Sequence, residues 1–240
     1  MAAGQINERS LRHAIYAFRD FAADRSGMPS QQNAWSDRLI KFYLNMYRAR
    51  ALYEKSGNQA MDGMFQVLPC VLMELVDMNE CPCLPASGCT FRKSTYPIPE
   101  TVGSIIAVNS VTGHLTFDYV RWMDYPLHIT SRFPAQRTAP MYTIKNINNE
   151  PYLYVYNKGE LEAVAITAVF VDPVEVAQFP NCGQEQPYLC NPLDKEFVCD
   201  EELKMKVFLL TYEHLSKTRS QSSDIRNNDA DGTSSQLPPK

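Results

Sequence analysis

The sequence predicts an α+β protein in which an N-terminal helical pair and a C-terminal helix form a bundle, with an inserted antiparallel β-domain that is sandwich- or barrel-like. Three observations predict this class. Apolar residues recur at helical spacing near the N-terminus, short β-compatible runs separated by turn residues fill the middle, and helical spacing returns near the C-terminus. The expected parts are a helical part at 1–64, the β-domain at 65–171, return helices at 172–215 and a polar tail at 216–240.

Two helices are expected in the N-terminal part. The first, capped by Asn7, ends before Gly27, where the chain loses its helical pattern. The second begins near Ser36 or Asp37 and runs to Ser56. These helices should present apolar faces to a common core.

The second helix carries two apolar stripes that point in different directions. One stripe consists of Leu39, Phe42, Tyr43 and Met46. The other consists of Ile40, Leu44, Tyr47 and Ala51. Because a helix on a single core needs only one apolar face, we expect the other face to contact another subunit. We assign Ile40, Leu44 and Tyr47 to that interface.

The middle of the chain is expected to form short antiparallel strands joined by tight turns. The expected strands are 65–68, 71–76, 105–108, 115–120, 141–147, 152–156 and 161–170. Pro69 should cause a break or a bulge between the first two strands. Gly113 indicates a hairpin turn, and Asn148-Asn149 a second turn.

Helical structure is expected to return at Asp172-Pro173, which places a capping carboxylate and a proline where a helix begins. A last helix should begin near Asp200 and is again apolar on two sides. We assign four of its residues to an intersubunit interface: Met205, Phe208, Leu209 and Tyr212. Beyond Ser216 the composition becomes polar, which predicts a tail that is disordered or orders only on a partner. Its Arg219 and Arg226 are assigned to the same interface.

Charge and targeting patterns exclude several classes of protein. The formal net charge is -4 at pH 7, and no basic stripe is visible, which disfavours direct DNA binding as the main task. The N-terminus lacks the apolar core of a secretory signal, and the apolar run at 161–171 is too short to cross a bilayer. We therefore expect reduced thiols for the seven cysteines.

Catalytic and metal-binding patterns are weak. The only close cysteine cluster, Cys81, Cys83 and Cys89, lacks the paired spacing of a structural zinc site, so we expect no metal and no cofactor. The four histidines are scattered, and no phosphate loop or nucleophile elbow occurs, so we expect no enzyme. The aromatic residues could form a carbohydrate or nucleobase platform. We favour cross-strand packing, because Tyr152, Tyr154 and Tyr156 share one strand face.

Four stretches of the sequence carry a resemblance to a known family. They are the opening helical pair at 7–55, the strand and cysteine-containing loop at 65–94 with the Pro97-Ile98-Pro99 step, the strand-to-helix junction at 169–176, and the closing helix at 200–215 followed by 224–228. In these stretches the chain resembles the neck ring proteins of crAss-like bacteriophages, which are podoviruses of gut Bacteroidales. The resemblance covers most of the chain but includes no active-site signature, so no functional residue is carried over.

The resemblance implies a structural subunit of the head-to-tail connector. Such proteins assemble with copies of themselves into rings, usually twelvefold, which lie beneath the portal, extend the DNA channel and offer a docking surface to the next ring or the tail. It implies a place in the virion after assembly in the host cytoplasm, passing contact with packaged DNA, and no membrane. Two alternatives remain open: a tail or baseplate subunit, and a small zinc- or nucleic-acid-binding accessory protein that uses the cysteine cluster.

Overall fold

A computed structural model of the chain describes residues 9–27, 35–56, 63–76, 91–129, 131–133, 139–156, 161–182 and 192–230; of residues 219–230 it describes the backbone. The chain divides into two compact units. One, the β unit, comprises residues 1–14 and 52–198, and the other, the helical unit, comprises residues 15–51 and 199–240. The α+β class predicted from the sequence is confirmed.

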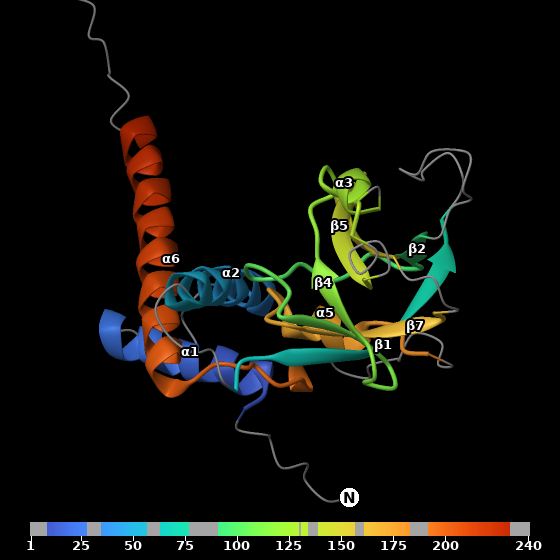
Figure 1. The fold of residues 1–240 in the computed structure, drawn as a ribbon. Coiled ribbons are helices and arrows are strands. Elements are labelled where there is room, and N and C mark those ends of the chain that lie inside the picture. Colours follow the sequence, from blue (N-terminus) through green and yellow to red (C-terminus); the bar gives the residue numbers. More distant parts are fainter. Residues whose placement is uncertain are drawn as a thin grey trace, which may run out of the picture. The chain divides into compact units, whose positions relative to one another are not determined.

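The helical unit is formed by α1 (Leu11–Ser26), α2 (Asp37–Ser56) and α6 (Glu201–Ala230), although the first turn of α1 and the end of α2 belong to the β unit (Figure 1). Aromatic side chains join the three helices. The rings of Phe18 and Phe208 lie 5.7 Å apart, and those of Tyr43 and His214 lie 4.5 Å apart. Such pairs stabilise a packed interior beyond the area that they bury.

Both N-terminal helices begin at serine side chains. The Ser10 hydroxyl accepts a hydrogen bond from the His13 N–H at 3.2 Å, and the Ser36 hydroxyl accepts one from the Leu39 N–H at 3.3 Å. Each bond satisfies a backbone donor that has no partner within the helix. Ser10 thus occupies the position expected for Asn7, which lies outside the described residues.

Helix α6 is longer than the sequence predicts. It begins at Glu201, as expected, but continues past Ser216 to Ala230. No glycine or proline occurs between these residues, so the backbone meets no strong helix breaker until Gly232. The first part of the predicted polar tail, residues 216–230, is therefore helical.

The β unit contains a closed seven-stranded barrel in the order β1-β2-β6-β5-β4-β3-β7. Its strands are β1 (Gln66–Leu75), β2 (Phe91–Ser94), β3 (Ala107–Ser110), β4 (Thr116–Tyr119), β5 (Met141–Ile147), β6 (Glu150–Tyr156) and β7 (Ala163–Ala168). The pair β4–β5 is parallel, so the expectation of a purely antiparallel domain is wrong at this seam. The sequence analysis also missed β2 and the short helix α3 (Tyr125–Ile129).

Turn chemistry explains several features of the barrel. Pro69 lies within β1, where the register against β7 shifts between Leu68 and Val71, so the predicted interruption is a bulge. Asn148 and Asn149 join β5 to β6 with φ values of 53 and 69, which is the geometry of a tight primed hairpin turn. Gly113, with φ 75, forms the predicted turn between β3 and β4.

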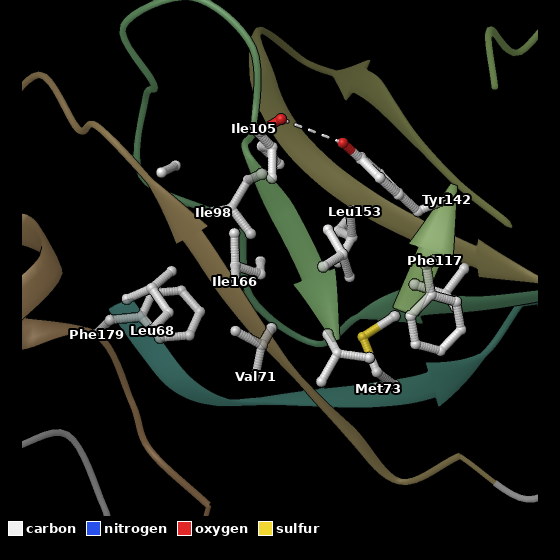
Figure 2. Packing of buried hydrophobic residues seen from close by; sticks show 14 of the residues in the cluster. Leu68, Val71, Met73, Ile98, Ile105, Phe117, Tyr142, Leu153, Ile166 and Phe179 are labelled. Carbon is white, nitrogen blue, oxygen red and sulfur yellow. Dashed lines mark hydrogen bonds between the residues drawn. The ribbon is translucent and has the colours of Figure 1, made fainter. Parts of the chain in front are cut away.

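Strand β6 is buried on both faces over its last four residues. Leu153 and Val155 of β6 join the larger core cluster, which includes Val71, Phe117 and Ile166 (Figure 2). The intervening residues Tyr154 and Tyr156 join a second cluster with Phe91, Tyr125 and Met141. The alternation follows from the two-residue period of a strand. It supports cross-strand packing as the role of these tyrosines.

One polar contact crosses the larger cluster. The Tyr142 hydroxyl donates a hydrogen bond of 3.4 Å to the Ile105 carbonyl, as Figure 2 shows. The bond gives a partner to a polar group that would be costly to bury alone. Burial, followed by the charge of nearby Tyr119, raises the pKa of Tyr142.

Two cysteines form a disulfide, contrary to the expectation of reduced thiols. Cys70 in β1 is bonded to Cys182, with a Cα–Cα distance of 5.4 Å. Cys182 follows the short helix α5 (Pro173–Gln178), which begins as predicted with the Asp172 carboxylate accepting a hydrogen bond from the Val174 N–H. The pair is separated by 112 residues, so no local pattern could reveal it.

Candidate interaction surfaces

The two apolar stripes of α2 have opposite environments in the structure. Ile40 and Leu44 are completely buried, and Tyr47 is 9% exposed, so the stripe assigned to an intersubunit interface belongs to the interior of this chain. Three residues of the other stripe are exposed: Leu39, Phe42 and Met46 are 38%, 60% and 37% exposed, whereas its fourth residue, Tyr43, is half-buried. We call Leu39, Phe42 and Met46 the α2 stripe.

The predicted interface residues on α6 are divided in the same way. Met205 is 53% exposed, whereas Phe208 is buried against Phe18 and Phe21. Leu209 and Tyr212 are half-buried. Arg219 and Arg226 lie on the backbone of α6, and their side chains are outside the described residues. Of the four assigned α6 residues whose side chains are described, only Met205 is largely exposed.

A buried polar group lies inside the helical unit beside a free thiol. Arg48 of α2 is fully buried, which is rare for an arginine. Cys199, just before α6, is a free cysteine, and burial raises its pKa to about 12. The Arg48 guanidinium opposes this shift, because a positive charge favours the thiolate. The thiol therefore stays protonated at neutral pH.

The most exposed large apolar residues of the β unit gather around α3. Met123 is 88% exposed, Leu127 69% and Phe133 68%. Arg132, which is also exposed, lies between the last two in the sequence. We call Met123, Leu127, Arg132 and Phe133 the α3 tip. Sequence analysis missed it as a surface, because α3 has only five residues and Phe133 lies beyond its end.

The α3 tip rests on a rigid base. Tyr125, at the first position of α3, is 1% exposed. Its ring lies 4.2 Å from that of Phe91 in β2 and 5.4 Å from that of Tyr156 in β6. Arg121, just before the helix, pairs with Asp124 at 2.6 Å. The aromatic anchor holds the turn against the barrel while the neighbouring apolar side chains face outward.

A second feature of the β unit is a groove of about 740 Å³, which we call the acidic groove. It is lined by the segment 96–101, by the β5–β6 hairpin and by the end of α5. Its apolar lining comprises Tyr96, Pro97, Ile98, Pro99, Ile144, Pro151, Phe179 and Pro180. Three carboxylates line it as well: Glu100, Glu150 and Glu175. None of the described lining residues is basic, so the groove has a negative charge at neutral pH.

Catalytic and metal chemistry finds little support in the described part of the chain. Asp118, Asp124 and His128 line one pocket of about 440 Å³ beside α3, whereas Asp172 caps α5 elsewhere. The described residues contain no group of three His, Cys, Asp or Glu side chains able to hold a metal ion. The cluster Cys81, Cys83 and Cys89 lies outside the described residues, so the zinc hypothesis stays a prediction. Among the described helices, none is both long and apolar enough to span a membrane.

Exposed apolar side chains on both units are typical of proteins that bind other proteins. The chain belongs to the phage tail ring protein 2 family, whose model matches residues 24–233. A similar protein, "Ring protein 2" of Bacteroides phage crAss001, is 22% identical over 218 residues. The alignment covers 87% of this chain and 92% of that relative. The resemblance to crAss-like phage ring proteins is thereby confirmed.

Proposed function

We propose that this chain is a structural, non-catalytic subunit of the virion that forms a ring in the neck of a tailed phage. In this proposal the ring joins the portal to the tail and surrounds the DNA channel. The observation that carries the proposal is the family match over residues 24–233, which places the chain among phage tail ring proteins. Exposed apolar surface supports it, because a ring subunit must cover such surface with its neighbours.

The partners follow from this geometry. Copies of the chain are the first partner, and we propose twelve in a ring, as the resemblance implies. The second partner is the portal or an adjacent neck or tail ring, and packaged DNA makes only passing contact. The net charge of -4 fits this role, because a channel wall that bound phosphates tightly would hinder the passage of DNA.

Imaging of purified particles tests the proposal directly. Proteomics of the virions should detect this chain, and a reconstruction of the portal vertex should resolve it as a closed ring between portal and tail. A virion that lacks the chain, or that holds it away from the vertex, would contradict the proposal.

The α2 stripe offers a matched test of assembly. We expect Phe42→Asp to prevent incorporation of the chain into particles while leaving its thermal unfolding unchanged, because Phe42 is exposed. The control is Ile40→Asp, two residues away but fully buried, which should unfold the chain by placing a charge in the interior. Normal incorporation of the folded Phe42→Asp variant would remove the α2 stripe from the interface.

A tail or baseplate position is the second candidate. One observation favours it: the family description names a tail ring protein and does not mention a neck. The same reconstruction separates the two positions. Density for the chain below the tail rings, rather than next to the portal, would favour the second.

A further inference from the structure

We propose that neighbouring copies of this chain contact each other head to tail, with the α3 tip of one copy in the acidic groove of the next. The inference rests on the proposed ring and adds to it the two surfaces that meet. Both surfaces belong to the β unit, and each is complete within one chain.

The two surfaces lie at opposite ends of one strand. Met141, the first residue of β5, lines the pocket beside α3, and Asn146, near its last residue, lines the acidic groove. Figure 1 shows α3 beside the start of β5. Five residues at about 3.3 Å each separate these positions by roughly 16 Å. Two different surfaces at separate places on one subunit are what a head-to-tail interface requires.

The α3 tip has the composition of an interface anchor. Met123, Leu127 and Phe133 are each more than two-thirds exposed. Burying such side chains in a pocket gives most of the binding free energy in a typical interface. Because Tyr125 fixes the turn to the barrel, little backbone conformational entropy is lost when the tip is covered.

The acidic groove is formed before any partner arrives. The Ile98 N–H donates a hydrogen bond of 2.8 Å to the Pro151 carbonyl, and the Val171 N–H donates one of 2.9 Å to the Glu100 carbonyl. These bonds tie the wall at 96–101 to β6 and to the chain after β7. The volume of about 740 Å³ lies within the range of pockets that bind compact ligands, and it can accept several side chains.

Charge favours this pairing over a pairing of like surfaces. The segment 121–133 contains Arg121, Asp124 and Arg132, so its formal charge is +2 − 1 = +1 with His128 neutral. The groove presents Glu100, Glu150 and Glu175 and no described basic residue. Two grooves would repel each other, whereas Arg132 beside Phe133 brings a positive charge to the carboxylates.

Photo-cross-linking of the full chain tests the contact. Phe133 is replaced by the photoreactive analogue p-benzoylphenylalanine, and the variant is mixed with isotope-labelled wild-type chain before irradiation. Mass spectrometry then identifies cross-links between labelled and unlabelled chains. We expect them at 96–101, 144–151 and 175–180, in several-fold excess over a control with the analogue at Val111. Val111 is 51% exposed but lines neither the groove nor the pocket beside α3.

A charge exchange provides a second, independent measurement. Arg132→Glu and Glu100→Lys should each weaken self-association about tenfold, because each brings like charges together. The double variant should recover the wild-type value, since every copy then carries both changes. Circular dichroism confirms that each variant is folded, and sedimentation measures association.

The outcomes separate this inference from the proposed function. Interchain cross-links at the three groove segments together with recovery in the double variant would support the pairing. Cross-links elsewhere, cross-links no more frequent than from Val111, or no recovery would overturn it. If the pairing is overturned but a ring of this chain is found at the portal vertex, the proposed function still holds. A vertex without the chain would refute that function, whatever the cross-links show.

Discussion

Cys199 illustrates how one position controls reactivity in this protein. Burial disfavours the charged thiolate and raises the pKa of Cys199 to about 12, above the ordinary value of about 8.5. The thiolate is the nucleophilic form, so the folded chain protects this cysteine from alkylation and oxidation. Other charges, including Arg48, modify this effect without reversing it.

The expected consequence is pH-dependent labelling. At pH 8 the thiolate fraction of Cys199 should be about 1 in 10,000 in the folded chain, against roughly a quarter after unfolding. Iodoacetamide should therefore modify Cys199 slowly below about pH 10, and faster as the pH approaches 12. Peptide mapping after timed labelling measures the rate, with the urea-unfolded chain as control. Equal rates in folded and unfolded chains at pH 8 would contradict a raised pKa.

Asn149 tests backbone geometry at a single residue. Its φ of 69 lies in the left-handed region, which asparagine tolerates and β-branched residues avoid. We expect Asn149→Val to lower the free energy of unfolding by about 1–2 kcal/mol and Asn149→Gly to leave it unchanged or higher. Urea unfolding measures both.

The matched control is Asn146→Val, the same change at an exposed position within β5. A strand position favours valine, so this variant should be neutral or slightly stabilising. If both valine variants lost the same stability, turn geometry could not be the reason.

Among the elements, α2 shows both what sequence predicts and what it does not. Its bounds and its two apolar stripes were predicted, because caps and helical period are local. Which stripe is buried could not be predicted, since Ile40 and Phe42 are both apolar and the choice depends on what packs against the helix. The structure buries the stripe that contains Ile40.

The missed elements have physical reasons as well. The sequence Phe91-Arg92-Lys93-Ser94 of β2 contains two charged residues and follows a proline-rich stretch, so it lacks a strand signal. Helix α3 has five residues and contains Pro126. The parallel pairing of β4 with β5 joins strands separated by more than twenty residues, where no turn fixes the register.

The disulfide leads to a prediction at the element scale. It joins the bulge of β1 to the chain after α5, close to Pro180 of the acidic groove. The double variant Cys70→Ser/Cys182→Ser should have a free energy of unfolding about 2–4 kcal/mol lower than that of the oxidised wild type, because the bond closes a long loop. Denaturant unfolding measures the difference.

Reductant provides the internal check. Dithiothreitol should lower the stability of the wild type and leave that of the double variant unchanged. The single change Cys199→Ser keeps the bond and should retain the response to reductant. If dithiothreitol left the stability of the wild type unchanged, the disulfide would not contribute to stability.

At the scale of the whole molecule, the end of α6 carries a further prediction. Residues after Ser216 are polar, yet their backbone is helical to Ala230. A polar helix that gains little from its own chain needs a neighbour to stabilise it. We predict that this segment orders against an adjacent ring, as proposed for the neck.

Truncation tests this idea. A chain that ends at Thr218 retains every described side chain of α6 and should fold with an unchanged melting temperature. Its incorporation into particles should fall severalfold, which quantitative proteomics of purified virions measures. Incorporation at the wild-type level would show that the segment is dispensable for docking.

The surfaces of the whole molecule were harder to predict than its fold. The order of helices and strands along most of the chain follows from local patterns, and the exposed Met205 was among the assigned residues. The α3 tip and the acidic groove were not found. The groove brings together residues from distant segments, such as Tyr96, Ile144 and Phe179, and only the closed barrel places these side by side.

Barrel closure has a consequence for crowding. Each strand is hydrogen-bonded on both sides, since β7 pairs with β1 as well as with β3. Because no strand of the described barrel lies at an open edge, a second chain finds no full-length edge strand to pair with. Copies of the chain can therefore lie close together at high local concentration without their sheets pairing edge to edge. Contacts between copies are then made by side chains.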